Sequence, residues 1–301
     1  MKLENNRVLR TNYILLASLL FSGLIMSRSS AADTTELAFS LLQNRPAIYI
    51  RVNQSKPFLV ILDTGLGRGL MLDNQKARAI GLQPLQTDVV DNLGMGQLKL
   101  QRYAKSTLSI GSMQLPISNI NGDERTPQLM AMMGKDKYGN SPVGVLSVWE
   151  FRDRQISFDL AEKALSLSTT QRLNAGEENV VPIIDTGRIP EFAIKIDGQP
   201  FNAHLDSGSS ASLILPSNML DKFSYQQPPK KQGKALTAGM EHSLWTAQLK
   251  GDVEIGSVRA QNPNILFINK LPRVNIGFSF FNKGKITIDG VNHLAKFEYR
   301  G

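Results

Sequence analysis

The chain has 301 residues, a formal net charge of +8 and no cysteine. The absence of cysteine excludes disulfide cross-links and lipid attachment at a cysteine, and this length allows a hydrophobic core to suffice without them. Basic residues are scattered, apart from one small cluster at Lys230, Lys231 and Lys234. Nucleic-acid binding is therefore not expected, because it needs a basic stripe interleaved with aromatic residues.

The first 32 residues have the pattern of a secretory signal peptide. Basic residues at positions 2, 7 and 10 precede an apolar stretch of 13 residues, 14–26, and small residues follow before Asp33. This stretch is shorter than the roughly 20 residues that cross a bilayer. We expect cleavage after residue 32 and a periplasmic or secreted protein with no stable membrane association. An uncleaved N-terminal anchor is the alternative.

The rest of the chain predicts a mainly β protein. Its apolar residues come in short runs rich in Val, Ile, Leu and Phe, without a strongly periodic helix of 15 or more residues. Two of these regions, residues 45–65 and 189–208, repeat each other. Each has an alternating strand, a polar turn, Pro-Phe, and a second strand that runs into Asp-Thr-Gly or Asp-Ser-Gly, with a proline six residues before Asp63 and before Asp206.

The repeat continues in chain order after each aspartate. A short apolar strand comes first, followed by a helix-start signal that predicts helices over residues 75–80 and 219–223. Next come Gly94-Met95 and Gly239-Met240, each 17 residues before the glycine of an Ile-Gly-Ser turn. The last features are Val143-Gly144, leading into a strand over 155–159, and Ile276-Gly277, leading into a strand over 285–289.

The ordered set of features predicts a duplicated chain. Asp-Thr-Gly alone is a common turn sequence, and we interpret a third copy, at residues 185–187, as a turn because the other features do not follow it. The polar residues 171–179 contain a glycine and suggest the boundary between copies. We therefore expect a signal peptide at 1–32, an N-terminal lobe at 33–172 and a C-terminal lobe at 173–301.

These motifs resemble the pepsin/retropepsin superfamily of aspartic peptidases over roughly residues 45–290. The resemblance implies an all-β, two-lobed acid-protease β-barrel fold with pseudo-twofold internal duplication and few short helices. Both copies carry Gly-Met, so the chain looks more like a single-chain, fused retropepsin dimer than like pepsin. The short form and the signal peptide resemble bacterial periplasmic members. Fused lobes imply that a monomer contains a whole active site.

The resemblance implies three groups of site residues. The catalytic pair would be Asp63 and Asp206. The residues that support the pair would be Thr64, Gly65, Ser207, Gly208 and Ser209, with the hydroxyls of Thr64 and Ser207 bonding across between the two loops. The substrate-binding flaps would be formed by Gly94, Met95, Gly96, Gly239 and Met240.

The chemistry expected of this pair is hydrolysis of peptide bonds. Of two carboxyl groups that share one proton, one takes a proton from water while the other donates to the carbonyl oxygen. We expect an aspartic-type endopeptidase that acts on an extended peptide or an unfolded protein, with no cofactor and no metal. The three histidines lack zinc spacing. His204 shares a strand face with Asp206, two residues on, and either tunes the pair or is a hydrogen-bonded structural histidine.

Two further functions remain open from the sequence. Leu66 follows the first Asp-Thr-Gly, and no tyrosine stands at the expected place in either flap. A catalytically silent peptide-binding protein on the same fold is therefore the main alternative. A structural component of the cell envelope would neither bind nor cleave peptides.

Overall fold

The structure, a computed structural model, describes residues 34–91, 97–184, 189–237, 240–256 and 258–299. These residues form 25 strands, two α-helices and three 3-10 helices, which confirms a mostly β protein. The predicted signal peptide and the third Asp-Thr-Gly lie outside these ranges. No helix within the described ranges is long and apolar enough to cross a membrane. The chain from Ala32 to Gly301 is one compact unit, and its predicted division at residue 172 stays a prediction.

One sheet is built from the first half of the chain. In sheet order its strands are β6 (Pro84–Asp91), β7 (Gln97–Tyr103), β10 (Ile120–Asp123), β5 (Leu70–Asp73), β11 (Gly144–Ser147), β4 (Phe58–Asp63), β3 (Arg45–Val52), β8 (Ser106–Ile110) and β9 (Met113–Ile117), and β2 (Ser40–Leu42) pairs with β3. Every residue of β4 before Asp63 is buried, because this strand runs inside the sheet between β3 and β11. A buried strand thus delivers Asp63 at its end.

A second sheet is built from the second half. Its order is β18 (Lys230–Thr237), β19 (Met240–Gln248), β22 (Asn264–Ile268), β17 (Leu213–Pro216), β23 (Val274–Gly277), β16 (Gln199–Asp206), β15 (Glu191–Ile196), β20 (Asp252–Ile255) and β21 (Val258–Gln261). Strand for strand this is the order of the first sheet, with β16 in the place of β4. The duplication in the sequence therefore has a counterpart in the strand order.

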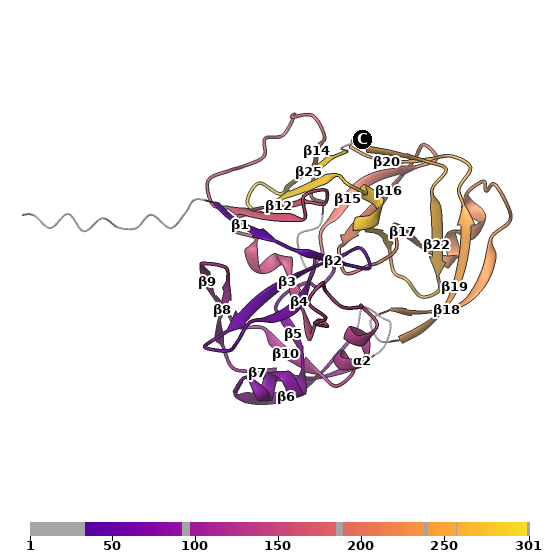
Figure 1. The fold of residues 1–301 in the computed structure, drawn as a ribbon. Helices are drawn as coiled ribbons and strands as arrows, with labels where there is room; N and C mark the ends of the chain where they lie inside the picture. The colour runs from indigo at the N-terminus through magenta and orange to yellow at the C-terminus, as the bar shows by residue number, and fades with distance from the viewer. Residues whose placement is uncertain (1–33, 92–96, 185–188, 238–239, 257, 300–301) are drawn as a thin grey trace, which may run out of the picture. The chain divides into compact units, whose positions relative to one another are not determined.

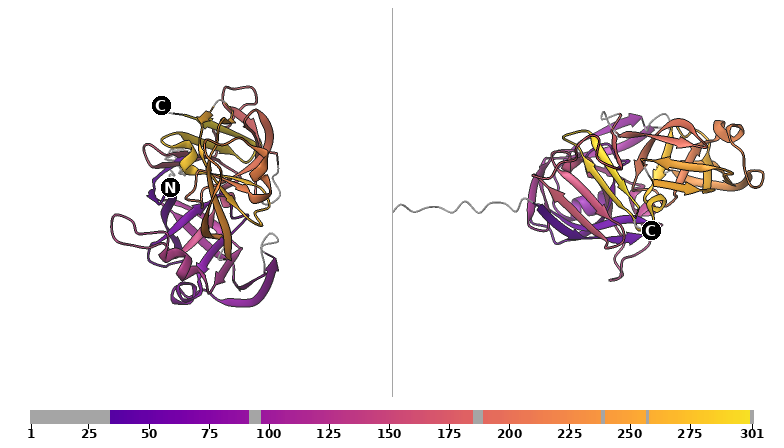
Figure 2. Two further views of the ribbon diagram at one scale, coloured as in Figure 1. Left: turned by 90° about the vertical axis from the view of Figure 1, so that its right-hand side faces the viewer. Right: turned by 90° about the horizontal axis from the view of Figure 1, so that it is seen from above.

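A third sheet combines strands of both halves. Its order is β1 (Thr34–Ala38), β13 (Ala164–Ser168), β12 (Gln155–Asp159), β24 (Lys285–Asp289), β25 (Leu294–Glu298) and β14 (Val180–Pro182). The equivalent strands β12 and β24 pair antiparallel at its centre, and the buried hydroxyls of Ser157 and Thr287 lie 2.9 Å apart across this pair. In Figure 1, β1, β12, β25 and β14 follow one another in this sheet order across the upper part of the view, and Figure 2 shows the same strands from two further sides.

The hydrophobic core joins the two halves. Its largest cluster includes buried side chains from all three sheets. The ring centroids of Phe158 and Phe278 lie 4.9 Å apart, and those of Phe192 and Phe297 lie 5.3 Å apart, all four being buried. Because close-packed interiors resist deformation, this core holds the ends of β4 and β16 in a fixed relation.

The two helices predicted after the aspartates form differently. Helix α1 (Asn74–Ala79) is an α-helix, as predicted, and the Asp73 side chain caps it by accepting from the backbone N–H of Gln75. Its counterpart η2 (Ser217–Lys222) is a 3-10 helix without a side-chain cap, because Pro216 stands at the capping position. Three more short helices complete the set in the described ranges: α2 (Thr126–Ala131), η1 (Val148–Phe151) and η3 (Phe278–Phe281).

The strand register corrects one part of the sequence alignment. Ser147 is the partner of Asp63 in the pairing of β11 with β4, and Gly277 is the partner of Asp206 in the pairing of β23 with β16. Ser147 is therefore the counterpart of Gly277, and the predicted equivalence with Val143-Gly144 is wrong by three residues. Burial sets this register, since Leu146 and Ile276 both enter the core one residue earlier.

We predict that Gly277→Ala destabilises the protein. An added Cβ would lie 2.0 Å from the backbone oxygen of Ala211, so the backbone would have to shift. Overpacking of this kind costs about 1–3 kcal/mol of unfolding free energy, measurable as a lower midpoint in denaturant. The equivalent position in the first half is Ser147, which already carries a Cβ, so the close approach is a property of Gly277 and not of both copies. An unchanged unfolding midpoint for Gly277→Ala would contradict the close packing of Gly277 against Ala211.

Candidate active site

The ends of β4 and β16 bring the carboxyl groups of Asp63 and Asp206 together. A Cβ added to Gly65 would lie 3.1 Å from Oδ1 of both aspartates, and one added to Gly208 would lie 2.6 Å from Oδ2 of Asp63. The two carboxyl groups thus converge on one point; a side chain at Gly208 would displace Asp63, and one at Gly65 would crowd both carboxyl groups. The predicted pair meets although 143 residues separate its members.

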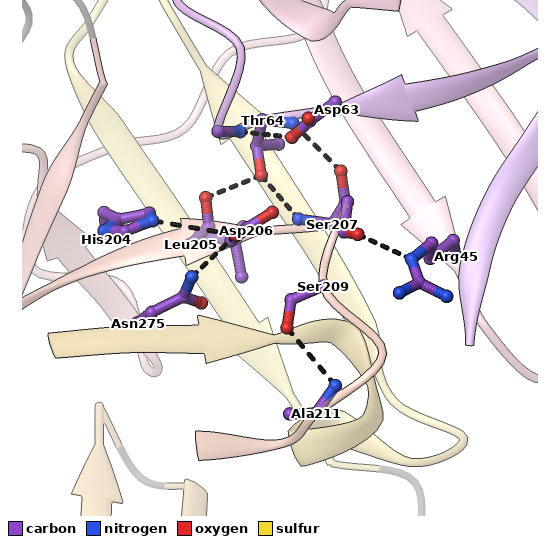
Figure 3. Close-up of polar contacts among 12 residues, drawn as sticks. Arg45, Asp63, Thr64, His204, Leu205, Asp206, Ser207, Ser209, Ala211 and Asn275 are labelled. Atoms are coloured by element: carbon purple, nitrogen blue, oxygen red, sulfur yellow. Dashed lines mark hydrogen bonds and ion pairs between the residues drawn. The ribbon is translucent and has the colours of Figure 1, made fainter. Parts of the chain in front are cut away.

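Thr64 and Ser207 interlock the two loops behind the aspartates (Figure 3). The backbone N–H of Thr64 donates to Oγ of Ser207 at 2.9 Å, and the backbone N–H of Ser207 donates to Oγ1 of Thr64, also at 2.9 Å. Each hydroxyl in turn donates to a backbone carbonyl of the opposite strand, Thr64 to Leu205 at 2.6 Å and Ser207 to Leu62 at 2.8 Å. Both residues are fully buried, so these four bonds are shielded from water.

Further side chains support the first loop. The indole N–H of Trp149 donates to the carbonyl oxygen of Thr64 at 2.9 Å, and the hydroxyl of Ser147 donates to that of Leu66 at 2.6 Å. Leu66 is therefore part of an ordered loop. In the loop after Asp206, the hydroxyl of Ser209 accepts a hydrogen bond from the backbone N–H of Ala211 at 3.2 Å, which stabilises the turn of this second loop. No sequence motif identifies Trp149 as a site residue, because its indole reaches a loop 85 residues earlier in the chain.

Asp63 holds its proton more tightly than an ordinary aspartate. Burial raises the pKa of Asp63 to about 7, and the adjacent charge of Asp206 acts in the same direction. Backbone N–H groups of Gly65, Leu66 and Gly208 lower this pKa in part. Asp63 is therefore the member of the pair that stays protonated at mildly acidic pH.

Asp206 has the opposite tendency. Burial alone would raise the pKa of Asp206, but the neighbouring His204 imidazole, which carries a positive charge when protonated, and a hydrogen bond from Asn275 hold this pKa below its ordinary value. The amide Nδ2 of Asn275 donates to Oδ2 of Asp206 at 2.6 Å, and Nε2 of His204 lies 3.8 Å from the same oxygen. Of the two sequence interpretations of His204, this contact favours the tuning role.

Arg45 is a site residue that the sequence did not reveal. It begins β3 in the first half, and its Nε donates to the carbonyl oxygen of Gly208 at 2.6 Å, next to the pair (Figure 3). Burial lowers the pKa of Arg45, while the charges of Asp206 and Asp63 act to raise it. Arginine keeps its charge under such conditions, so a fixed cation interacts with both aspartates.

The flap prediction lies mostly outside the described residues. Gly94, Met95, Gly96 and Gly239 are not described, and Met240 begins β19 without a described side chain. The hairpins that lead to them are present, since β6 pairs with β7 and β18 pairs with β19, both antiparallel. A group of three or more histidine, aspartate or glutamate side chains that could hold a metal ion does not occur in the described part of the chain.

We predict that Thr64→Val weakens the interlock. This nearly isosteric change would leave the N–H of Ser207 and the carbonyl of Leu205 buried without these partners. Each orphaned buried group costs about 1–3 kcal/mol of unfolding free energy, which a denaturant titration measures. Thr64→Ser is the control, because it keeps the hydroxyl and loses only a methyl group. Equal unfolding midpoints for the Val and Ser variants would contradict the interlock.

Comparison with known proteins bears on the second half of the site. A search of curated proteins found no match to the chain. A family model does match part of the chain, from Phe192 in β15 to Phe280 in η3, and this part contains Asp206, Ser207 and Gly208. Residues 192–280 are thus similar to the family described as aspartyl protease.

Proposed function

We propose that this protein is an exported aspartic endopeptidase in which Asp63 and Asp206 activate water. The observation that carries the proposal is the convergence of two carboxyl groups from opposite halves of the chain on one point, backed by the four hydrogen bonds of Thr64 and Ser207. The match of residues 192–280 to the aspartyl protease family supports it. Like charges this close resist ionising together, so the pair shares one proton.

A single proton on the pair is sufficient for hydrolysis. The ionised aspartate accepts a proton from water while the water oxygen attacks the carbonyl carbon of the peptide bond. The protonated aspartate donates its proton to the carbonyl oxygen, which yields a neutral tetrahedral intermediate. When the C–N bond breaks, the amine leaves with the proton taken from water, and the hydroxyl proton of the intermediate returns to the pair. One water is consumed, and the pair ends in its starting state.

The substrate in this proposal is an extended peptide or an unfolded protein. Two antiparallel hairpins, β6–β7 and β18–β19, occupy equivalent places in the two sheets. Gly94-Met95 lies between β6 and β7, and Gly239-Met240 leads into β19. Hairpins on both halves correspond to a single-chain, two-lobed, retropepsin-like arrangement, in which the substrate binds as a strand through its backbone. Both aspartates come from one chain, so a monomer suffices, without cofactor or metal.

The place of action in this proposal is the periplasm or the extracellular space. It rests on the N-terminal pattern of basic residues, a 13-residue apolar stretch and small residues before Asp33. After cleavage the mature chain would begin at Asp33, directly before β1. Export would give the enzyme access to unfolded envelope proteins and peptides, and would keep it apart from cytoplasmic chains.

We predict that Asp63→Asn and Asp206→Asn each abolish cleavage of an unfolded protein. Each change removes the shared proton site while keeping the shape of the side chain, so the folded structure should persist. The assay is digestion of a diverse peptide library between pH 3 and pH 8, with and without a statine-type inhibitor, and circular dichroism checks folding. Undiminished turnover by either variant would refute the proposed mechanism. A wild-type protein that binds these peptides without cutting them would support the silent peptide-binding alternative.

We also predict that activity falls as the pH rises through about 7. The pKa of Asp63 is raised to about 7, so this carboxyl is protonated below that pH and loses its proton above it. The enzyme needs that proton to donate to the carbonyl oxygen. A profile of kcat/KM against pH should therefore decline on its alkaline side near neutrality. Full activity at pH 9 would be inconsistent with Asp63 as the proton donor.

A further inference from the structure

The two halves place different residues around their aspartates. In the first half, Ile61 lies two residues before Asp63, and its strand partners are Ala47 on β3 and Val145 on β11. In the second half, the same positions hold His204, with strand partners Glu191 on β15 and Asn275 on β23. An apolar trio beside one aspartate thus corresponds to a polar trio beside the other.

The apolar trio offers no hydrogen bond to Asp63. Ala47 and Ile61 are almost fully buried in a small hydrophobic cluster with Leu42 and Met130, against which Val145 packs. Aliphatic side chains lack polar hydrogens, so on this side Asp63 has only a low-polarity neighbour. Such surroundings penalise the ionised form of a carboxyl group.

The polar trio directs two side chains at Asp206. Asn275 donates to Oδ2 of Asp206 at 2.6 Å, and Nε2 of His204 lies 3.8 Å from that oxygen. Asn275 is 5% exposed and His204 is 7% exposed. In the part of the chain that is described, Oδ1 of Asn275 and Nδ1 of His204 have no hydrogen-bond partner. The polar contacts of both side chains are therefore directed at Asp206, although burying them is costly.

The other charged groups near Asp206 do not explain why the two aspartates differ. Asp63 approaches from β4, and Arg45 reaches in from β3 and interacts with both aspartates. Glu191, on β15, forms an ion pair with Arg273, which precedes β23, so its charge is balanced. The asymmetry between the two aspartates therefore comes from Asn275 and His204.

We propose that Asn275 and His204 are positioning residues that fix the polarity of the pair: Asp206 is the ionised member, and Asp63 carries the proton. Asp206 then takes the proton from water, and Asp63 donates to the carbonyl oxygen. These catalytic roles rest on the proposed peptidase function, whereas the polarity is a property of the pair itself. A donor at the place of Asn275 stabilises a carboxylate, and a valine at the equivalent place does not.

The test uses the residues that the chain itself carries at the equivalent positions. Asn275→Val and His204→Ile copy Val145 and Ile61 beside Asp206, and His204→Gln is the control that keeps a donor without a charge. Titration of ¹³C-labelled aspartate side chains by NMR, assigned with the Asp63→Asn and Asp206→Asn variants, reports each carboxyl without any turnover. The acidic side of the kcat/KM profile is the second readout.

We expect Asp206 to titrate below Asp63 in the wild-type protein. Asn275→Val should raise the pKa of Asp206. The acidic side of the kcat/KM profile should therefore shift to higher pH by about one unit, which corresponds to the free energy of one lost charge-assisted hydrogen bond. His204→Ile should shift it in the same direction, and His204→Gln by less. A merely structural role would lower kcat at every pH and leave this limb in place.

A mirror variant probes the other aspartate. Val145→Asn would add a hydrogen-bond donor on the side of Asp63. The pKa of Asp63 should then fall, and the alkaline side of the kcat/KM profile should shift to lower pH. Asp63 titrating below Asp206 in the wild type, or an unchanged Asp206 titration in Asn275→Val and His204→Ile, would overturn the inference. If Asp206 titrates below Asp63 but no peptide is cut, the proposed peptidase function is refuted and this inference stands. If peptides are cut but the two aspartates do not titrate in this order, the inference is refuted and the peptidase function stands.

Discussion

Two carboxyl groups held against each other in a poorly solvated site cannot both ionise, and the fold of this protein resists their separation. At about 4 Å and an effective dielectric constant near 20, two unit charges repel by roughly 4 kcal/mol. Without a rigid support, side chains or loops would move apart and relieve that repulsion. The buried interlock of Thr64 and Ser207 supplies this support. The pairing of β12 with β24 and the shared core stabilise it from behind.

The duplication explains why the pair exists, and its departures from symmetry explain how the two members differ. Equivalent strands deliver equivalent aspartates, and a symmetric site would leave the proton equally on either. Asn275 and His204 break this symmetry on the side of Asp206. Arg45 also departs from the duplication, because its strand position in the second half is occupied by the apolar Ile189, but its charge acts on both aspartates. A duplicated scaffold can thus acquire an acid and a base by changing a few neighbours of each carboxyl.

The sequence was sufficient to predict which aspartates and glycines meet, because they belong to local motifs that recur at matching spacings in the two copies. The bonding of the Thr64 and Ser207 hydroxyls across the two loops was predicted only from the resemblance to aspartic peptidases. The register of β11 against β4 was harder to predict, because Val143-Gly144 resembles Ile276-Gly277 in sequence. In the structure Leu146 is buried, and Ser147 is therefore the residue opposite Asp63. Arg45 and Trp149 could not be predicted, since each reaches a loop distant in sequence. Asn275 could not be predicted either, since its contact with Asp206 depends on the pairing of β23 with β16.

Counting protons on the pair tests the central claim most directly. The difference between potentiometric titrations of the wild-type protein and the Asp63→Asn/Asp206→Asn double variant gives the number of protons that the two carboxyls bind. Between about pH 5 and pH 6, ordinary aspartates hold almost none, because their pKa is near 3.9. A carboxyl pair that shares a proton must hold one in this range. Uptake of one proton per chain is the predicted result, and a value near zero would contradict it.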